Sequence, residues 1–170
     1  MGVPKAATTI MGEVIDLTGS ELPEKVAFQV MGKPQAEPRA RMGPYGMYYP
    51  NGPRRTAFRQ FIIRQVPETA RGPVFPAGVS VAVVVRCYLR RPNTDFKRGD
   101  RLGHMLKAMV PSARPVVPDI DNMAKFILDA MNGLVYKDDR QVVHLVVSKL
   151  LDNEGACEGR TEVEVTQYKA

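Results

Sequence analysis

The sequence predicts an α/β or α+β fold, a single domain in which helices flank one small mixed sheet. Its 170 residues match one ordinary domain, and a hydrophobic content of 44% is enough for a core. Segments with a strand pattern alternate with segments of helical periodicity. Their order is strand, helix, strand, loop, helix, strand, strand, whereas the order of the strands within the sheet does not follow from the sequence.

The first half of the chain is expected to contribute one long strand and one helix. Residues 26–30 alternate apolar and polar side chains and predict the first strand. Residues 32–46 are rich in Gly, Pro and Arg and predict a loop, followed by a short strand at MYYP. Residues 53–66 start with a proline and carry an apolar stripe, which predicts a helix with an arginine-rich face.

The second half begins with the strongest strand pattern, the β-branched residues 79–91. Residues 92–118 show no pattern, and so long a loop in a compact domain is usually functional or disordered. A helix that Gly133 is placed to end follows. Its apolar stripe comprises Met123, Phe126, Ile127, Ala130, Met131 and Leu134. Residues 141–152 and 161–168 predict the last two strands.

Charge is unevenly distributed along the chain. Lys and Arg total 24 against 18 Asp and Glu, so the net charge is +6 and the pI is near 9.5. Residues 31–66 carry seven basic and one acidic side chain, and residues 86–114 carry eight basic and two acidic. Residues 115–170 carry ten acidic and six basic. A pI above 9 with clustered cations is expected of a nucleic-acid binder.

Several other classes of protein are disfavoured. Cys87 and Cys157 lack the CxxC spacing of zinc sites, and two cysteines make no disulfide framework, so a reducing compartment is expected. No signal peptide is visible, and the longest apolar run, Val81–Val85, is too short to span a bilayer. We expect a cytoplasmic protein with a flexible arm at residues 1–23 and one folded domain at residues 24–170.

Carboxylates gather around the second predicted helix. Asp119 and Asp121 lie two residues apart at its start, so in extended backbone their side chains point to the same side. Asp138 and Asp139 follow the helix and precede the next strand. If that strand begins beside the start of the helix, a third carboxylate joins the first two. Oxygen ligands of this kind suit Mg²⁺, with Mn²⁺ as a substitute.

Lys125 lies four residues after Asp121 and therefore shares its helical face. A lysine beside a metal-bound phosphate can stabilise the charge that develops during phosphodiester hydrolysis. Each feature also has a purely structural interpretation. Asp121 can cap the helix, Asp121 and Lys125 can form a surface ion pair, and Asp138–Asp139 can form a turn. Taken together in a basic protein, these residues favour a metal-dependent nuclease.

Two segments carry distinctive patterns. PDIDNMAKFILDAMNGLVYKDDRQVV (118–143) contains D-x-D-N-x-x-K, D-A-x-N-G and D-D-x-Q-V, and GKPQAEPRAR (32–41) follows G-K-P-x-x-x-x-R-x-R. The first segment resembles the signature of the RusA-type Holliday-junction resolvases, in which leucine is usual at the position of Met131, and the second is similar to the loop that follows the first strand in that family. The resemblance extends over roughly residues 26–166.

The resemblance implies a Mg²⁺-dependent endonuclease from bacteria or phage. Such an enzyme acts as a homodimer, with one active site per subunit, and cuts four-way junctions by paired symmetric nicks in DNA recombination and repair. Carried over by position, the metal ligands are Asp119, Asp121 and Asp139, and the catalytic lysine is Lys125. Two further acids have supporting roles, Asp138 beside Asp139 and Asp129, which is expected to orient Lys125 from one helical turn away.

Basic residues are expected to follow the DNA backbone and supply affinity rather than sequence readout. The predicted contacts are Lys33, Arg39, Arg41, Arg54, Arg55, Arg98, Arg101 and Lys107, with Arg59 and Arg114 as further candidates. Tyr45, Tyr48 and Tyr49 could stack on bases at an opened junction, although packing in a strand or core is the commoner role of such residues.

Two other functions remain open at the level of sequence. One is a metal-dependent nuclease that acts on different branched DNA, such as forks or flaps, which the sequence does not separate from a resolvase. The other is a junction-binding protein without turnover. The intact set of Asp119, Asp121, Lys125 and Asp139 argues against the second, because a protein that only binds DNA needs no acidic cluster facing phosphate.

Overall fold

The computed structural model describes residues 8–10, 13–15, 22–48, 50, 52–67, 72–97, 107, 109–153 and 158–169. The strands are β1 (Thr8–Ile10), β2 (Glu13–Ile15), β3 (Lys25–Met31), β4 (Arg41–Gly43), β5 (Gly46–Tyr48), β6 (Val81–Leu89), β7 (Val142–Leu151) and β8 (Gly159–Gln167). The helices are α1 (Gly52–Ile63) and α2 (Ile120–Met131), with short 3-10 turns η1 (Asn93–Asp95) and η2 (Asp139–Gln141).

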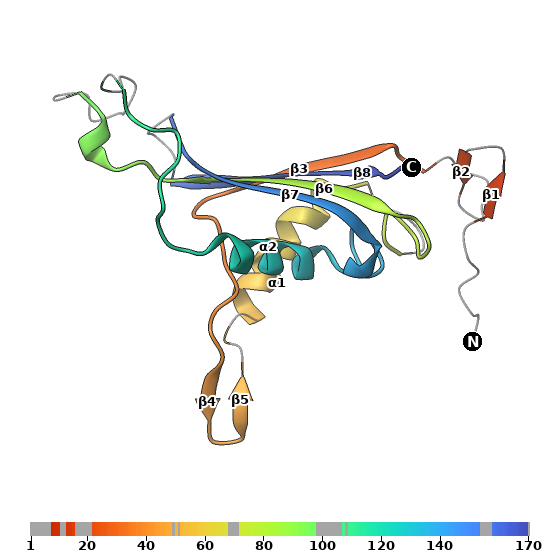
Figure 1. Cartoon of the computed structure of the whole chain (residues 1–170). Helices are drawn as coiled ribbons and strands as arrows, with labels where there is room; N and C mark the ends of the chain where they lie inside the picture. Colours follow the sequence, from red (N-terminus) through yellow and green to blue (C-terminus); the bar gives the residue numbers. More distant parts are fainter. Residues whose placement is uncertain are drawn as a thin grey trace.

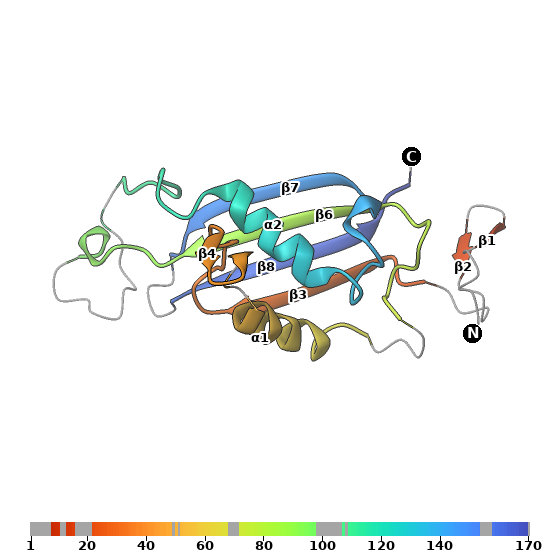
Figure 2. The same cartoon turned by 90° about the horizontal axis from the view of Figure 1, so that it is seen from below.

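Four strands form one mixed sheet in the order β3-β8-β6-β7. β8 pairs antiparallel with both β3 and β6, whereas β6 and β7 run parallel. Both helices pack on the same face of this sheet (Figure 1). The view from below shows that α1 lies along β3, at one edge, whereas α2 lies across β6 in the middle of the sheet (Figure 2). The predicted single small α+β domain with one mixed sheet is confirmed.

The core lies between the sheet and the helices because β3, β6 and β8 alternate buried side chains with more exposed ones. Alternate side chains of β6 and β8 are buried, and β6 contributes Val81, Val83, Val85, Cys87 and Leu89. The predicted stripe of α2 faces them, with Met123, Phe126, Ile127, Ala130 and Met131 fully buried. Phe58 of α1 meets Phe126 of α2 edge to face at 5.5 Å, which joins the two helices.

Most predicted elements are confirmed, with small shifts of their ends. Gly133 follows Asn132, the C-cap residue of α2, and adopts a positive φ of 74°, as expected at the end of a helix. Asp119, not Asp121, occupies the N-cap position of α2, so the capping role considered for Asp121 is wrong.

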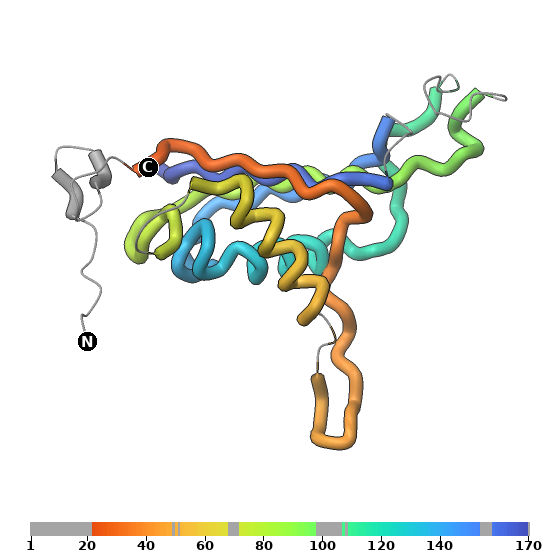
Figure 3. The backbone as a smooth tube through the Cα atoms, turned by 180° about the vertical axis from the view of Figure 1, so that it is seen from behind, coloured from red at the N-terminus to blue at the C-terminus, as the bar shows by residue number. Residues whose placement is uncertain are grey.

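Two regions differ from the expectation. The predicted loop 32–46 contains β4, which pairs with β5 to form a small hairpin. Seen from behind, this hairpin extends well away from the sheet and the helices (Figure 3). Within the predicted arm, β1 and β2 pair with each other. The division into an arm of residues 1–23 and a domain of residues 24–170 stays a prediction.

The long connection from β6 to α2 is anchored by buried charges where the structure describes it. Arg91 donates to Asp95 at 3.1 Å and to the backbone oxygens of Pro111 and Asp152. Arg114 donates to the other Asp95 oxygen at 2.8 Å. Burial favours the neutral acid, but the two arginines prevail and lower the pKa of the Asp95 carboxyl. Ion pairs therefore fix both ends of this connection.

In the described part of the chain, no helix combines the length and apolar character needed to cross a membrane.

Candidate active site

The start of α2 presents two carboxylates to solvent. Asp119 has extended backbone angles, and its side chain makes no capping hydrogen bond. Asp121 follows in the first turn of the helix, and both residues are exposed. Asp119 therefore occupies the N-cap position, but its carboxylate does not accept a hydrogen bond from the backbone N–H groups of the first turn, as an N-cap side chain usually does. The carboxylate is left facing outward.

Two contacts from other elements hold this helix start in place. Lys149 of β7 donates its ammonium hydrogens to the backbone oxygens of Val116 and Pro118, the latter at 3.0 Å. On the other side, the Glu37 N–H donates to the Asn122 C=O at 2.9 Å. The acidic pair is thus positioned by the last part of β7 and by the loop that follows β3.

Lys125 lies one turn further along α2 and is exposed. Asp129, one turn beyond it, accepts a hydrogen bond from Arg55 at 3.1 Å. The same Arg55 nitrogen lies 2.9 Å from Glu37, whose side chain is only 7% exposed. Arg55, which belongs to α1, therefore connects this helix both to the loop after β3 and to α2. Asp129 thus forms an ion pair with Arg55, and its expected role in orienting Lys125 stays a prediction.

Asp138 and Asp139 lie at the opposite end of α2. Figure 2 shows η2 beyond the last turn of the helix, where β7 begins. Asp138 caps η2 reciprocally with Gln141 and accepts hydrogen bonds from Arg140, which lower the pKa of its carboxyl to about 2. Asp139 is exposed. Because α2 has 12 residues, its two ends are separated by about 18 Å.

The three predicted metal ligands are consequently not assembled within one chain. The condition under which a third carboxylate would join the first two is not met within one chain, because β7 begins beside the end of α2 and not beside its start. Among the described residues, no three His, Cys, Asp or Glu side chains lie close enough to hold a metal ion. Asp119 and Asp121 share one helix start, Asp139 does not join them, and their role in metal binding stays a prediction.

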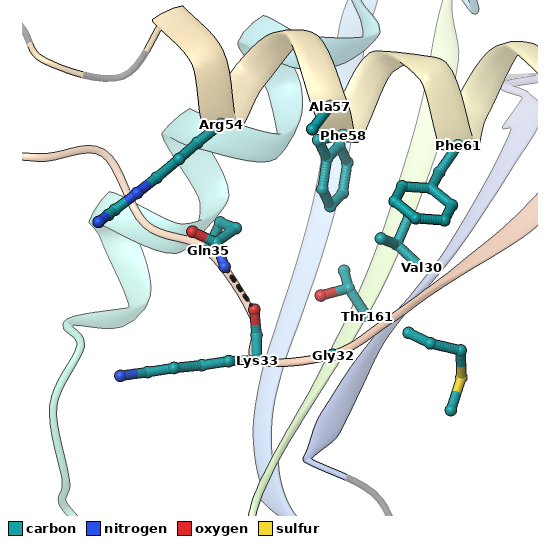
Figure 4. A pocket seen from close by; sticks show the side chains of 10 residues that line it. Val30, Gly32, Lys33, Gln35, Arg54, Ala57, Phe58, Phe61 and Thr161 are labelled. Atoms are coloured by element: carbon teal, nitrogen blue, oxygen red, sulfur yellow. Dashed lines mark hydrogen bonds between the residues drawn. The ribbon is translucent and has the colours of Figure 1, made fainter.

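Cations border the acidic helix start. Lys33 and Arg54 lie on the rim of a hollow of about 280 Å³, whose apolar wall includes Val30, Phe58 and Phe61 (Figure 4). A second hollow, of about 420 Å³, is lined by three cations and one acid, together with Val116 and Val117. The cations are Lys33, Arg90 and Arg114, and the acid is Glu158, which lies 3.8 Å from Arg90. Lys33 lines both hollows, and the second one includes the residues directly before Pro118 and Asp119. An anion approaching the carboxylates therefore meets positive charge on the way.

The other predicted DNA contacts lie in different surroundings. Arg39 and Arg41 are exposed beside and within β4. Lys107 donates to the Thr94 C=O at 2.6 Å. Arg98 and Arg101 lie outside the described residues.

One basic residue, Arg59, and one acidic residue, Glu37, have structural roles that the sequence analysis did not identify. Arg59 donates to the C=O groups of Ala130 and Asn132 at 2.8 Å each, which satisfies the carbonyl end of α2. Glu37 was missed because it matches no acidic motif. It was nevertheless visible as the lone acid among seven basic residues in 31–66, a sign that it pairs with one of them.

Fold and site together define a small α+β protein whose exposed carboxylates lie among cations, a combination suited to chemistry on nucleic-acid phosphates. Residues 28–166 match the model of a protein family described as "Endodeoxyribonuclease RusA". The chain belongs to the RusA family of endodeoxyribonucleases. It is also 30% identical over 148 residues to "Uncharacterized protein YqaN" of Bacillus subtilis (strain 168), a match covering 85% of this chain and 98% of that protein.

Proposed function

We propose that this protein is a Mg²⁺-dependent, structure-specific endodeoxyribonuclease that resolves four-way DNA junctions by paired symmetric nicks. The observation that carries the proposal is the exposed pair Asp119 and Asp121 at the start of α2, bordered by cations, in a chain of the RusA family. Such an enzyme acts on cellular or phage DNA in the cytoplasm during recombination and repair.

The start of α2 suits a hard cation in part. Asp119 and Asp121 supply exposed oxygen atoms, and the side chain of Asp119 makes no capping hydrogen bond. Mg²⁺, when bound, would activate water and offset charge on the phosphate. Lys125, one turn away, is proposed to face the scissile phosphate and stabilise its developing negative charge. Lys33 and Arg54 would bind flanking phosphates and orient the strand.

A homodimer is proposed because a second copy can bring its own Asp139 to the pair Asp119 and Asp121, from which Asp139 of the same chain is separated. β7 forms one edge of the sheet, and its apolar side chains Val143, Leu145 and Val146 are 54%, 41% and 40% exposed. Such an edge invites pairing with another strand. Two-fold pairing of β7 with β7 of a second copy is antiparallel, so the beginning of one strand lies beside the end of the other.

That arrangement would bring Asp139 of the second copy toward the acidic pair. Asp139 directly precedes β7, whereas Lys149 near the end of β7 holds Pro118, the residue before Asp119. Antiparallel pairing therefore puts the beginning of the partner strand next to the start of α2. The proposal gives each dimer two equivalent sites, as two symmetric nicks require.

The test is cleavage of a labelled four-way junction beside a linear duplex, a fork and a flap, in Mg²⁺ and in EDTA. We expect paired symmetric nicks in the junction that disappear in EDTA. Asp121→Asn should abolish cleavage while keeping or tightening junction binding, because one charge that repels phosphate is removed. Preferred cutting of forks or flaps would assign a different branched substrate. Tight junction binding without cutting in Mg²⁺ or Mn²⁺ would leave a binding protein without turnover.

A further inference from the structure

The hairpin of β4 and β5 projects from the domain with an apolar surface. Its two strands pair Arg41 with Tyr48 and Met42 with Met47, so the two methionines share one face. Met42 is 77% and Met47 is 68% exposed, and Tyr45 at the turn is fully exposed. In Figures 1 and 3 the hairpin stands apart from the sheet and both helices. Of the expected packing of these tyrosines in a strand or core, the strand is confirmed for Tyr48 in β5, and the core is wrong for both Tyr45 and Tyr48.

Such a surface is costly unless something covers it. An isolated two-stranded hairpin is marginally stable in water, and exposed apolar side chains gathered in one place usually mark a binding surface. The hairpin nevertheless has internal order. A Cβ at Gly43 would lie 3.1 Å from the ring of Tyr48, so this ring lies close against the opposite strand. A compact strand pair with an apolar end is suited to insertion between two surfaces.

The charge around the hairpin indicates the kind of molecule into which the hairpin would insert. Residues 38–55 contain four arginines and no acidic residue. Arg39 and Arg41 are exposed at the stem of the hairpin, and Arg54 is exposed where the chain enters α1. A partner that satisfies both features carries dense negative charge and also offers flat apolar faces. DNA with unstacked bases has both properties, whereas an intact duplex hides its base faces.

The segments on either side of the hairpin contact the helix that carries the acidic residues. The loop that leads into β4 is bound to α2 by the hydrogen bond from the Glu37 N–H to the Asn122 C=O, next to Asp121. The residues that follow β5 lead directly into α1, where Arg55 bonds to Asp129 of α2. Both stems of the hairpin are therefore fixed to the helix that carries the proposed site.

We infer that the β4–β5 hairpin is a wedge that inserts at the branch point of junction DNA. Met42, Tyr45 and Met47 contact unstacked base pairs, while Arg39 and Arg41 contact the phosphates of the arms that part around it. The inference rests on the proposed function, because a branch point is where duplex ends offer their base faces. It adds a residue set that distinguishes branched from linear DNA.

The experiment uses the full chain with a four-way junction that carries 2-aminopurine beside the branch point, in EDTA to prevent cleavage. Wild-type protein should increase the fluorescence of the probe as the base unstacks. The triple variant Met42→Ser, Tyr45→Ser, Met47→Ser should lose most of this increase. It should bind the junction about 10-fold more weakly, with unchanged affinity for linear duplex. Tyr45→Ser alone should show a smaller effect in the same direction.

Ile63→Ser is the matched control. Ile63 is also an exposed apolar residue, but it is the last residue of α1, whereas the hairpin leads into the first turn of that helix. This variant should behave as the wild type in every assay. Circular dichroism and thermal unfolding of all variants establish that their folds are intact.

Two results overturn the wedge while leaving the proposed function in place. One is a wild type that cuts the junction in Mg²⁺ together with a folded triple variant that keeps the fluorescence increase and the affinity. The other is a triple variant whose mass in solution falls from dimer to monomer, which would make the hairpin a dimerisation arm. A wild type that neither binds nor cuts the junction overturns the proposed function and the wedge with it.

Discussion

Arg55 Nη2 lies 2.9 Å from a carboxylate oxygen of Glu37, and this pair fixes the loop after β3 to α1. The Glu37 side chain is 7% exposed and that of Arg55 is 30% exposed. Because Asp129 shares the same nitrogen, one guanidinium serves carboxylates from two different segments. The neighbouring Arg54 is exposed and lines the 280 Å³ hollow instead. Adjacent arginines of one helix therefore have different tasks.

Arg55→Ala should destabilise the fold, because it leaves a buried and a half-buried carboxylate without their shared cation. We expect the free energy of unfolding to fall by about 1–3 kcal/mol. Arg54→Ala is the control and should change it by less than about 0.5 kcal/mol, as usual for an exposed position. Urea unfolding measures both variants. Equal stabilities would show that the ion pair makes no net contribution.

The affinity for DNA should depend on Arg54, the neighbour with little expected effect on stability, and on Lys33. Arg54→Ala and Lys33→Ala each remove a proposed phosphate contact, so junction and duplex should both be bound more weakly. In a plot of log affinity against log salt concentration, each variant should reduce the slope by about 1. Fluorescence anisotropy over a range of salt concentrations gives the slope. An unchanged slope would place these cations outside the DNA surface.

Much of the fold was accessible from sequence because its pattern is locally strong. β6 has four valines among its first five residues, and α2 repeats its apolar residues with helical spacing, so both were predicted close to their observed bounds. β4 was missed since its three residues, Arg41–Gly43, lie among Gly, Pro and Arg and carry no strand pattern. The exposure of Tyr45 follows from that hairpin and could not be inferred without it.

The candidate site was less accessible, because its assembly depends on strand order. Asp119 and Asp121 were identified correctly as exposed residues at the start of a helix. The position of Asp139 depends on β7 running parallel to β6 and antiparallel to α2, which no local pattern encodes. Asp129, one partner of Arg55, and the carbonyl groups that bind Arg59 likewise lie more than 70 residues away in the chain, and these contacts arise only from tertiary packing.

Lys125→Ala tests the catalytic part of the proposal. The variant should cut the junction much more slowly, because a cation near the scissile phosphate is lost at the step where negative charge develops. Its dependence on Mg²⁺ concentration should stay close to that of the wild type, since lysine binds no cation. Single-turnover cleavage at several Mg²⁺ concentrations separates the two effects. A near-normal rate would remove Lys125 from the mechanism.

Cys87 provides a test of the core. Its side chain is fully buried on β6, and burial raises the pKa of the thiol from 9.0 to about 11. At pH 8 the native thiol is therefore almost entirely protonated and unreactive. Iodoacetamide should leave Cys87 unmodified in native protein and modify it in denaturing urea, as read by peptide mass spectrometry. Fast labelling of the native chain would contradict this packing.

The sign of the Cys87 effect on stability follows from the direction of the shift. A thiol whose pKa is higher in the folded than in the unfolded chain stabilises the fold fully below pH 9.0. That contribution is lost as the pH rises toward about 11, because the unfolded chain ionises first. Cys87→Ala removes this titration, so the difference in unfolding free energy between wild type and variant should narrow over that interval.

A site shared between two copies makes a distinctive prediction about mixtures. Asp121→Asn and Asp139→Asn should each abolish cleavage as homodimers. If each site combines Asp119 and Asp121 of one copy with Asp139 of the other, a heterodimer of the two variants has one site with every carboxylate intact. Random exchange gives half heterodimers, so about a quarter of the wild-type number of sites should return.

Restored heterodimers should nick one strand only, because their second site carries both substitutions. The two variants are mixed, unfolded in urea and refolded together, and then assayed on the labelled junction in Mg²⁺. A control mixture of Asp119→Asn with Asp121→Asn should remain inactive, since both residues belong to the same half of the site. An inactive first mixture, with heterodimers demonstrated by native mass spectrometry after one variant has been given a mass tag, would mean that each site lies within one chain, so that Asp139 must reach α2 by a rearrangement of η2.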